Sequence, residues 1–358
     1  MAPIIRFLTV LAFAASSAVN GYSLEVRGSD SREAASWTGK IENLVVFGDS
    51  FTDENRFVYF INHNGSAPPP GTILPESAST ATGGRSWARF VSQYTGINLY
   101  NYAVIGAVCS NSLTPRTLSS DLGLLFPAVK DYELPAFYAD VATPSFPKLS
   151  PSDTLYAIWI GTNDLGGDCI ITGLPNVGLT NFTQCVIDVA KDLYDHGARN
   201  FMILNLAPIE RAPLYAPLGE GGREGPRRFW RGKGANATGI SRRMRDLVQG
   251  GNEIFKYKIP AELGVLKGAK VGVMDTYGLM SDIWHNPAQY LNGSLPYNTT
   301  GANVDCDING VCTNYRLQDR DSFLWYDELH PSEQVSRVIA REVSNAVQKK
   351  TSKWIKYW

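Results

Sequence analysis

The stretch Asn43-Leu-Val-Val-Phe-Gly-Asp-Ser50 combines a short apolar run with a sharp turn. Residues 43–47 are apolar and rich in β-branched side chains, which is typical of a strand buried on both faces of a parallel sheet. Gly48 and Asp49 end the run and put a serine at the corner where the strand gives way to the next element. At such a corner a hydroxyl group can be exposed while several backbone N–H groups point at one spot. We therefore expect residues 43–47 to form the first strand of a sheet, with Ser50 at its carboxyl end.

Four further apolar runs and four helical patterns follow along the chain. The runs cover residues 99–105, 154–160, 200–206 and 270–274. Apolar residues recur at helical spacing over residues 86–94, from Phe182 to a stop at Gly197, and over 240–248 and 335–343. Strands that alternate with helices predict a doubly wound, three-layer α/β sandwich with a central, mainly parallel five-stranded sheet and right-handed crossovers.

The first residues have the pattern of a secretory signal. Residues 1–6 form a short segment whose positive side chain is Arg6, and residues 7–15 are apolar. The small residues Ser16, Ser17, Ala18 and Gly21 follow. The apolar stretch is too short for a membrane anchor. We expect a signal peptide over 1–21, cleaved after Ala18 or Gly21, then an extension over 22–40 and a single domain over 41–358. Residues 67–76 and 218–234 are rich in Pro or Gly and read as long loops on that domain.

Composition excludes several classes of partner. The chain of 358 residues has 33 Lys+Arg against 34 Asp+Glu, which argues against a protein that coats nucleic acid. A basic run over 223–245 has acidic neighbours at Glu220, Glu224 and Asp246, so a solvated face or a contact with anionic glycans is favoured there over a nucleic-acid site. The hydrophobic fraction of 44% is sufficient for a sizeable core, and no apolar run is long enough to span a membrane. We expect a monomer without a membrane anchor.

Sequons and cysteines agree with export. The five Asn-x-Ser/Thr sequons, which are candidate glycosylation sites, start at Asn64, Asn181, Asn236, Asn292 and Asn298.

Five cysteines in an exported chain suggest two disulfides and one spare thiol, and the count alone leaves about 15 pairings open. A turn-like segment separates Cys306 from Cys312, and a Gly/Pro-rich loop separates Cys169 from Cys185. We expect these two pairs to form disulfides, with Cys109, between apolar residues, as a buried free thiol. Neither the cysteines nor the four histidines have the spacing of a zinc site.

Polar or glycine residues stand at the ends of the expected strands, where sites lie in open α/β sheets. They are Ser50, Gly106, Asn163 and Asp275. Near the C-terminus, Asp327 and His330 flank the start of a helix, and three residues of separation allow the carboxylate to accept from the imidazole Nδ1–H group. His330 Nε2 would then be free to act as a general base toward a serine. The alternative is that Asp327 caps the helix and His330 is a surface residue.

Taken together, these blocks resemble the GDSL, or SGNH, hydrolase superfamily. Its four letters fall on Ser50, Gly106, Asn163 and His330, in that order, within a match that runs from about Leu44 to Val347. The longer words that begin at Phe47 (FGDSFTDENR) and at Trp325 (WYDELHPSEQ) look like fungal acetylesterases of carbohydrate esterase family 16. Phe51 stands where the GDSL motif has Leu. No G-x-S-x-G elbow is present, which disfavours the α/β-hydrolase family.

The resemblance implies roles for individual residues. Ser50 would be the nucleophile, His330 the general base and Asp327 its orienting carboxylate. The backbone N–H groups of Ser50 and Gly106 and the Asn163 amide would form the oxyanion hole. The substrate would be a small ester or an acetylated oligosaccharide, and neither a metal nor an organic cofactor would be needed.

Several neighbouring residues have a plainer interpretation. Asp49, Asp53 and Asp164 lie near the site by sequence and are expected to brace loops. Among the tryptophans, Trp159 is expected in the core, whereas Trp325 and also Trp87 are candidates for lining the substrate pocket.

Three functions remain open at this point. The first is a secreted esterase that removes acetyl groups from plant-polysaccharide fragments. The second is a secreted lipase or phospholipase of the same superfamily, which should carry an apolar lid or an amphipathic surface helix. The third is a carbohydrate-binding protein that has lost catalysis, but none of the catalytic residues is missing.

Overall fold

Six strands form the central sheet of the protein, a computed structural model that describes residues 35, 37–315 and 317–358. The strand order is β12-β7-β6-β5-β1-β2, and every neighbouring pair is parallel except β12 with β7. The strands are β1 (Asn43–Gly48), β2 (Asn98–Asn101), β5 (Thr154–Trp159), β6 (Asn200–Leu204), β7 (Lys270–Met274) and β12 (Ile355–Tyr357). The central strands β1, β5 and β6 are buried along their whole length, as their apolar sequences predict.

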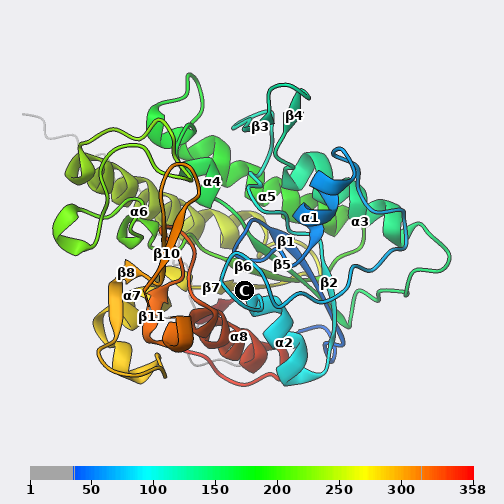
Figure 1. The fold of residues 1–358 in the computed structure, drawn as a ribbon. Helices are drawn as coiled ribbons and strands as arrows, with labels where there is room; N and C mark the ends of the chain where they lie inside the picture. Colours follow the sequence, from blue (N-terminus) through cyan, green and yellow to red (C-terminus); the bar gives the residue numbers. More distant parts are fainter. Residues whose placement is uncertain (1–34, 36, 316) are drawn as a thin grey trace, which may run out of the picture.

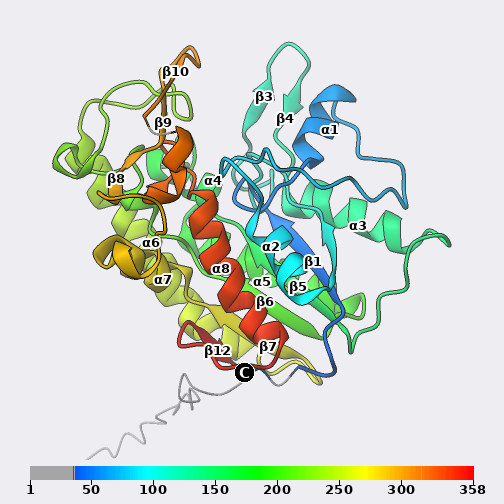
Figure 2. The same cartoon turned by 60° about the horizontal axis from the view of Figure 1, so that its bottom comes forward.

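Helices cover both faces of this sheet, so the fold has three layers. Figure 2 shows α2 and α8 side by side in front of the sheet, with α5 and α6 behind it. In the described part of the chain the α-helices are α1 (Arg56–Asn62), α2 (Trp87–Thr95), α3 (Leu134–Val141), α4 (Thr162–Leu165), α5 (Leu179–Asp195), α6 (Ala237–Glu262), α7 (Thr276–His285) and α8 (Glu333–Val347).

The predicted fold class is confirmed, with differences at the edges. The sheet has a sixth strand, β12, whose three residues carry no periodic signal. The second strand was expected over 99–105, but β2 ends at Asn101. Helix α6 extends to Glu262, well beyond the expected 240–248. Helices α1, α3, α4 and α7 were not predicted.

The N-terminal predictions are only partly covered by the structure. The expected signal peptide over 1–21 lies outside the described residues, as does most of the extension over 22–40. Trp37 is described and buried, and its indole N–H donates to the Ala346 carbonyl at 2.8 Å. This contact ties the chain ahead of β1 to α8. Within the described ranges, none of the helices combines the length and the apolar content of a membrane span.

Among the described residues, three small two-stranded sheets add to the core fold. Two of them are antiparallel hairpins, which rise at the upper end of the sheet in Figure 2, the end where β1 finishes. The strands are β3 (Thr117–Ser119) with β4 (Leu124–Leu125), β9 (Val304–Cys306) with β10 (Cys312–Asn314), and β8 (Asn298–Ala302) with β11 (Phe323–Trp325).

Buried aspartates brace the loops at this end of the sheet, as the sequence predicted. Asp53 accepts hydrogen bonds from the backbone N–H groups of Arg56, Phe57 and Ile105. Asp164 accepts from the Cys109 N–H and from the Thr114 hydroxyl. The two carboxylates therefore fix the segment around Gly106 from both of its sides.

The disulfides differ from the expected pairing. Cys306 and Cys312 are bonded, but the second bridge joins Cys109 to Cys185, and Cys169 is a buried free thiol. The predicted Cys169–Cys185 pair and the free Cys109 were therefore wrong. The loop after β2 brings Cys109 next to Cys185 in α5. The two residues are far apart in the sequence, and no local pattern around Cys109 predicts this contact.

We predict that peptide mapping without reduction finds Cys109–Cys185 and Cys306–Cys312. Burial raises the pKa of the Cys169 thiol to about 12, so iodoacetamide should label it only after denaturation. The Cys109–Cys185 bridge closes a loop of 76 residues, and such a loop is worth about 4 kcal/mol in the chain-entropy treatment. Replacing both cysteines by alanine should lower the free energy of unfolding by an amount of that order. A Cys169–Cys185 peptide, or rapid labelling of native Cys169, would contradict this pairing.

A second prediction concerns stability and pH. Burial raises the pKa of Asp49 from its usual 3.8 to about 6, although a hydrogen bond from the Phe51 N–H opposes the shift. Between these two values the folded protein binds a proton that the unfolded chain has released. The contribution of Asp49 to stability is therefore present below pH 4 and is lost as the pH rises through 6.

Asp49→Asn should remove this dependence, because an amide does not titrate in this pH range. The Asn oxygen can still accept the hydrogen bond from the Phe51 N–H, so the turn should be kept. Denaturant unfolding from pH 4.5 to 7.5 should show the variant gaining about 2–3 kcal/mol relative to the unsubstituted protein. The matched control is Asp121→Asn at an exposed loop position, which should give a constant difference over that range. A constant difference for Asp49→Asn as well would contradict the prediction.

Candidate active site

Ser50 lies in a tight turn at the end of β1. Strand β1 approaches β5 so closely at Gly48 that a Cβ there would lie 2.1 Å from the Trp159 carbonyl oxygen, and Gly48 also has a φ of +152°. The Asp49 carbonyl then accepts from the N–H groups of Thr52 and Asp53, which closes the turn. The Ser50 side chain is thus held on a short, rigid corner, only 4% exposed.

His330 and Asp327 lie in the segment between β11 and α8. His330 Nε2 is 2.8 Å from Ser50 Oγ, and His330 Nδ1 is 2.9 Å from each carboxylate oxygen of Asp327. All three side chains are buried. An ionised Asp327 can only accept, so Nδ1 carries the proton and Nε2 accepts from the Ser50 hydroxyl.

The alternative interpretation was wrong, because Ser332 and not Asp327 caps α8 and because His330 is buried. Asp327 still has a structural role. Its Oδ1 also accepts from the backbone N–H groups of Leu329 and His330, so it shapes the turn as well as facing the imidazole. The His330 ring lies edge-to-face between Phe51 and Phe229, with ring centroids 5.8 and 5.1 Å away. These contacts leave the imidazole little freedom to rotate.

Three hydrogen-bond donors converge beside the Ser50 hydroxyl. Within the described part of the chain, the N–H groups of Ser50 and Gly106 donate to no protein atom. Asn163 Nδ2 donates to the Ala107 carbonyl at 2.9 Å with one of its two hydrogens, which leaves the other free. Ser50, Gly106 and Asn163 line the same cavity, and donors arranged in this way can stabilise a negatively charged oxygen.

The cavity over Ser50 has a volume of about 160 Å³ and mainly apolar walls. It is lined by Ser50, Phe57, Ile105, Gly106, Arg116, Phe126, Thr162, Asn163, Gly166, Gly167, Tyr215, Phe229, Leu329 and His330.

The expected tryptophans do not contribute to these walls. Trp325 is fully buried beneath the site, and the Trp87 indole N–H donates to the Thr52 hydroxyl inside the core, so both predictions were wrong. Trp159 lies in the core as expected.

The aromatic walls come instead from Phe57 on α1 and from Phe126, Tyr215 and Phe229, which lie in loops. Helix α1 spans only seven residues and the loops have no periodicity, so no sequence signal identified these side chains.

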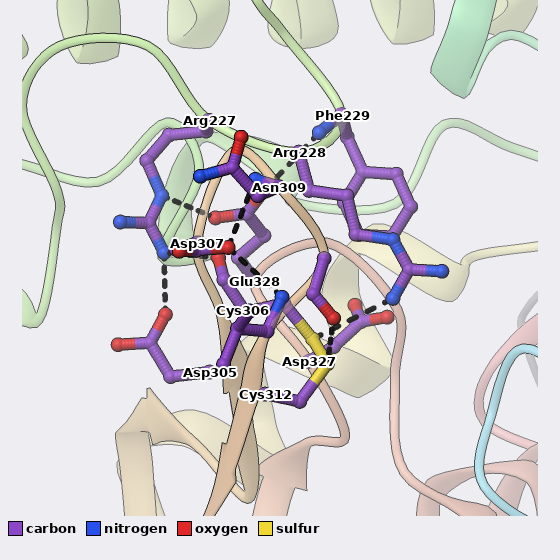
Figure 3. Close-up of a disulfide and its surroundings, with 12 residues drawn as sticks. Arg227, Arg228, Phe229, Asp305, Cys306, Asp307, Asn309, Cys312, Asp327 and Glu328 are labelled. Atoms are coloured by element: carbon purple, nitrogen blue, oxygen red, sulfur yellow. Dashed lines mark hydrogen bonds and ion pairs between the residues drawn. A yellow bond between two sulfur atoms is a disulfide. The ribbon is translucent and has the colours of Figure 1, made fainter.

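Phe229 is held in the wall by Glu328, which lies between β11 and α8, and Glu328 is itself bound by Arg227 on the loop of Phe229. Glu328 accepts from the Phe229 N–H at 3.3 Å and from Arg227 Nε at 2.6 Å, and the Arg227 guanidinium also contacts Asp305 and the Cys306 carbonyl (Figure 3). Burial raises the pKa of Glu328, and its bond to Arg227 opposes that shift. Arg227 and Arg223 in the basic run thus form ion pairs with Asp305 and Glu328, which are distant in the sequence.

The remaining predicted site residues are dispersed over the surface. Asp275 accepts from the Gly278 N–H and caps α7. The sequon residues Asn64, Asn181, Asn236 and Asn292 are exposed, and Asn298 is half-buried.

Comparison with known proteins agrees with this arrangement. The family described as GDSL-like Lipase/Acylhydrolase matches residues 44–343. An acetylesterase of Hypocrea jecorina is 37% identical over 321 residues, which cover 88% of this chain and 91% of the relative. An acetylesterase of Thermothelomyces thermophilus is 26% identical over 85% of this chain and 87% of its own length. A solved acetylxylan esterase of Geobacillus stearothermophilus shares 16% identity over 86% of this chain and 95% of that one, with a TM-score of 0.42, too low to bear on the assignment. The chain therefore belongs to the GDSL-like lipase/acylhydrolase family and is a carboxylic ester hydrolase.

Proposed function

We propose that this protein is a secreted serine esterase that removes acetyl groups, with fragments of acetylated plant polysaccharides as its substrates. The observation that carries the mechanism is the continuous line of hydrogen bonds from Ser50 through His330 to Asp327. The similarity to two acetylesterases supports the acetyl group as the acyl part.

The reaction proceeds in two halves. Ser50 Oγ attacks the ester carbonyl carbon while its proton passes to His330 Nε2, and the Asp327 carboxylate stabilises the imidazolium. The N–H groups of Ser50 and Gly106 and the free hydrogen of Asn163 Nδ2 bind the oxyanion. His330 returns the proton to the leaving alcohol, which departs and leaves acetyl-Ser50. Water then attacks with His330 as base and releases acetate and free Ser50.

The size of the cavity supports a short acyl group. A cavity of about 150 Å³ encloses one benzene molecule, and the present cavity is about 160 Å³. An acetyl group has fewer heavy atoms than benzene, whereas an eight-carbon acyl chain has more. Bulky rings, including Phe57, Phe126 and Phe229, bound the space.

One observation favours the lipase alternative. Helix α1 and the β3–β4 hairpin lie together, with Phe57 and Phe126 stacked at 5.9 Å. Their outer surfaces expose Val58, Ile61 and Leu122 to 48%, 46% and 67%. Exposed apolar groups beside a site can contact a lipid surface.

Export is supported by two disulfides and by sequons that are accessible to a glycan. N-terminal sequencing and glycosidase treatment of the protein from the culture medium test this part. A protein retained in the cell with residues 1–21 intact would contradict it.

The nucleophile is tested by substitution. Ser50→Ala should fold normally and lose at least about 10⁴-fold in kcat on p-nitrophenyl acetate, because no other group can form the acyl-enzyme. Asp327→Asn should lose about 10²- to 10⁴-fold, since it removes the charge that orients His330. The control is Ser112→Ala at an exposed serine, which should keep full activity. Substantial activity in Ser50→Ala would refute the mechanism.

Acyl preference separates the two functions. Along p-nitrophenyl esters from acetate to octanoate, kcat/KM should fall by about tenfold or more, because the extra methylenes do not fit. The same preparation should release acetate from acetylated xylo-oligosaccharides. A rate that rises toward octanoate would replace the acetylesterase by a lipase, since each methylene that fits an apolar pocket adds to specificity.

A further inference from the structure

Arg116 enters the cavity from the base of the β3–β4 hairpin. It immediately precedes β3, and its carbonyl accepts from the Phe126 N–H just after β4, at 2.8 Å. The hairpin thus delivers two neighbouring side chains, Arg116 and Phe126, to the wall beside Ser50. The guanidinium carbon of Arg116 lies 4.8 Å from the Phe126 ring centroid.

One nitrogen of Arg116 joins two parts of the oxyanion hole. Arg116 Nη1 donates to the Gly106 carbonyl at 2.8 Å and to Asn163 Oδ1 at 2.9 Å. Gly106 follows β2, whereas Asn163 lies in α4 after β5. The guanidinium therefore adds a link between two segments that the Asn163–Ala107 and Asp164–Cys109 hydrogen bonds also join. Both are segments whose N–H groups face the same cavity.

This contact decides the orientation of the Asn163 amide. A guanidinium has only donors, so the atom of Asn163 that faces it must be the oxygen. The amide nitrogen is then directed to the Ala107 carbonyl, with its second hydrogen left for the cavity. If the amide were turned by 180°, its NH2 group would face the N–H donors of Arg116, and its oxygen would face the carbonyl oxygen of Ala107. Neither contact could then be a hydrogen bond.

The charge on Arg116 is not matched by a direct ion pair among the residues that the structure describes, and its two acceptors are neutral oxygens. At longer range this charge acts on the Asp49 carboxyl, whose pKa is raised by burial and lowered in part by the guanidinium. Nearby charges act strongly in a site with apolar walls. A positive charge behind Asn163 polarises the amide in the sense that favours a negative oxygen at its N–H group.

We propose that Arg116 is a positioning residue of the oxyanion hole, which fixes the Asn163 amide and the Gly106 loop for the transition state of ester hydrolysis. The inference rests on the proposed function. Removal of Arg116 should affect kcat far more than KM, because oxyanion contacts form only as the negative charge develops.

The test compares Arg116→Ala with a matched control. Arg199→Ala removes a guanidinium that also lies over a ring, that of Tyr194 at 4.2 Å, and also donates to two carbonyl groups, but at the start of β6. With p-nitrophenyl acetate, Arg116→Ala should lose about 10- to 100-fold in kcat, less than the loss of a whole donor. Its KM should stay within about threefold of the parent, and Arg199→Ala should match the parent in both.

Two further readouts separate positioning from folding. Millimolar guanidinium should restore part of the kcat of Arg116→Ala and none of that of Asn163→Ala. Arg116→Lys, which keeps the charge and one donor group, should fall between the parent and Arg116→Ala, so a poorly folded alanine variant does not remove the test.

Three outcomes would overturn the inference. They are an unchanged kcat in Arg116→Ala or Arg116→Lys, an equal loss in Arg199→Ala, or a loss confined to KM. Failure of the proposed function is a separate result, because it would appear as activity in Ser50→Ala or as a rate that rises toward octanoate, whatever Arg116 does.

Discussion

Buried carboxylates hold three separate loops in one arrangement, and the site depends on that arrangement. Asp53 lies three residues after Ser50 and binds the N–H of Ile105, next to Gly106. Asp164 follows Asn163 and binds the N–H of Cys109, on the other side of Gly106. Without these acceptors, buried N–H groups would lack partners, at a cost of about 1–3 kcal/mol each. The three segments of the proposed oxyanion hole are therefore tied to one another within the core.

The order of strands brings these loops to one place. From β1 the chain moves to β2 at one edge and then crosses to β5 on the other side of β1. The junction of β1 and β5 is a topological switch point, where sites form in open α/β sheets. Gly48 marks it, because no other residue fits against the Trp159 carbonyl. His330 arrives from the far end of the chain, between β11 and α8, so the hydrogen bond to Ser50 closes the fold across 280 positions.

Local pattern explains what could be predicted. The buried strands and the helices predicted over 86–94, 182–197 and 335–343 follow from apolar periodicity, and the residues at the strand ends follow from the parallel topology. The structure brings Ser50, Asp327 and His330 within hydrogen-bond distance, as their motifs suggested. Features that depend on long-range approach were out of reach: the Cys109–Cys185 bridge, the edge strand β12, the aromatic walls and Arg116. The prediction that Trp325 lines the pocket failed, because closeness to His330 in the sequence does not determine which way a side chain points.

The most direct measurement is a crystal structure of the protein after reaction with a methylphosphonate ester, which mimics the tetrahedral intermediate of acetyl transfer. The account predicts a covalent bond from phosphorus to Ser50 Oγ. The charged oxygen should accept hydrogen bonds from the N–H groups of Ser50 and Gly106 and from Asn163 Nδ2, while Arg116 keeps its bond to Asn163 Oδ1. A phosphonate on another residue, or one on Ser50 whose oxygen turns away from Gly106 and Asn163, would contradict the account.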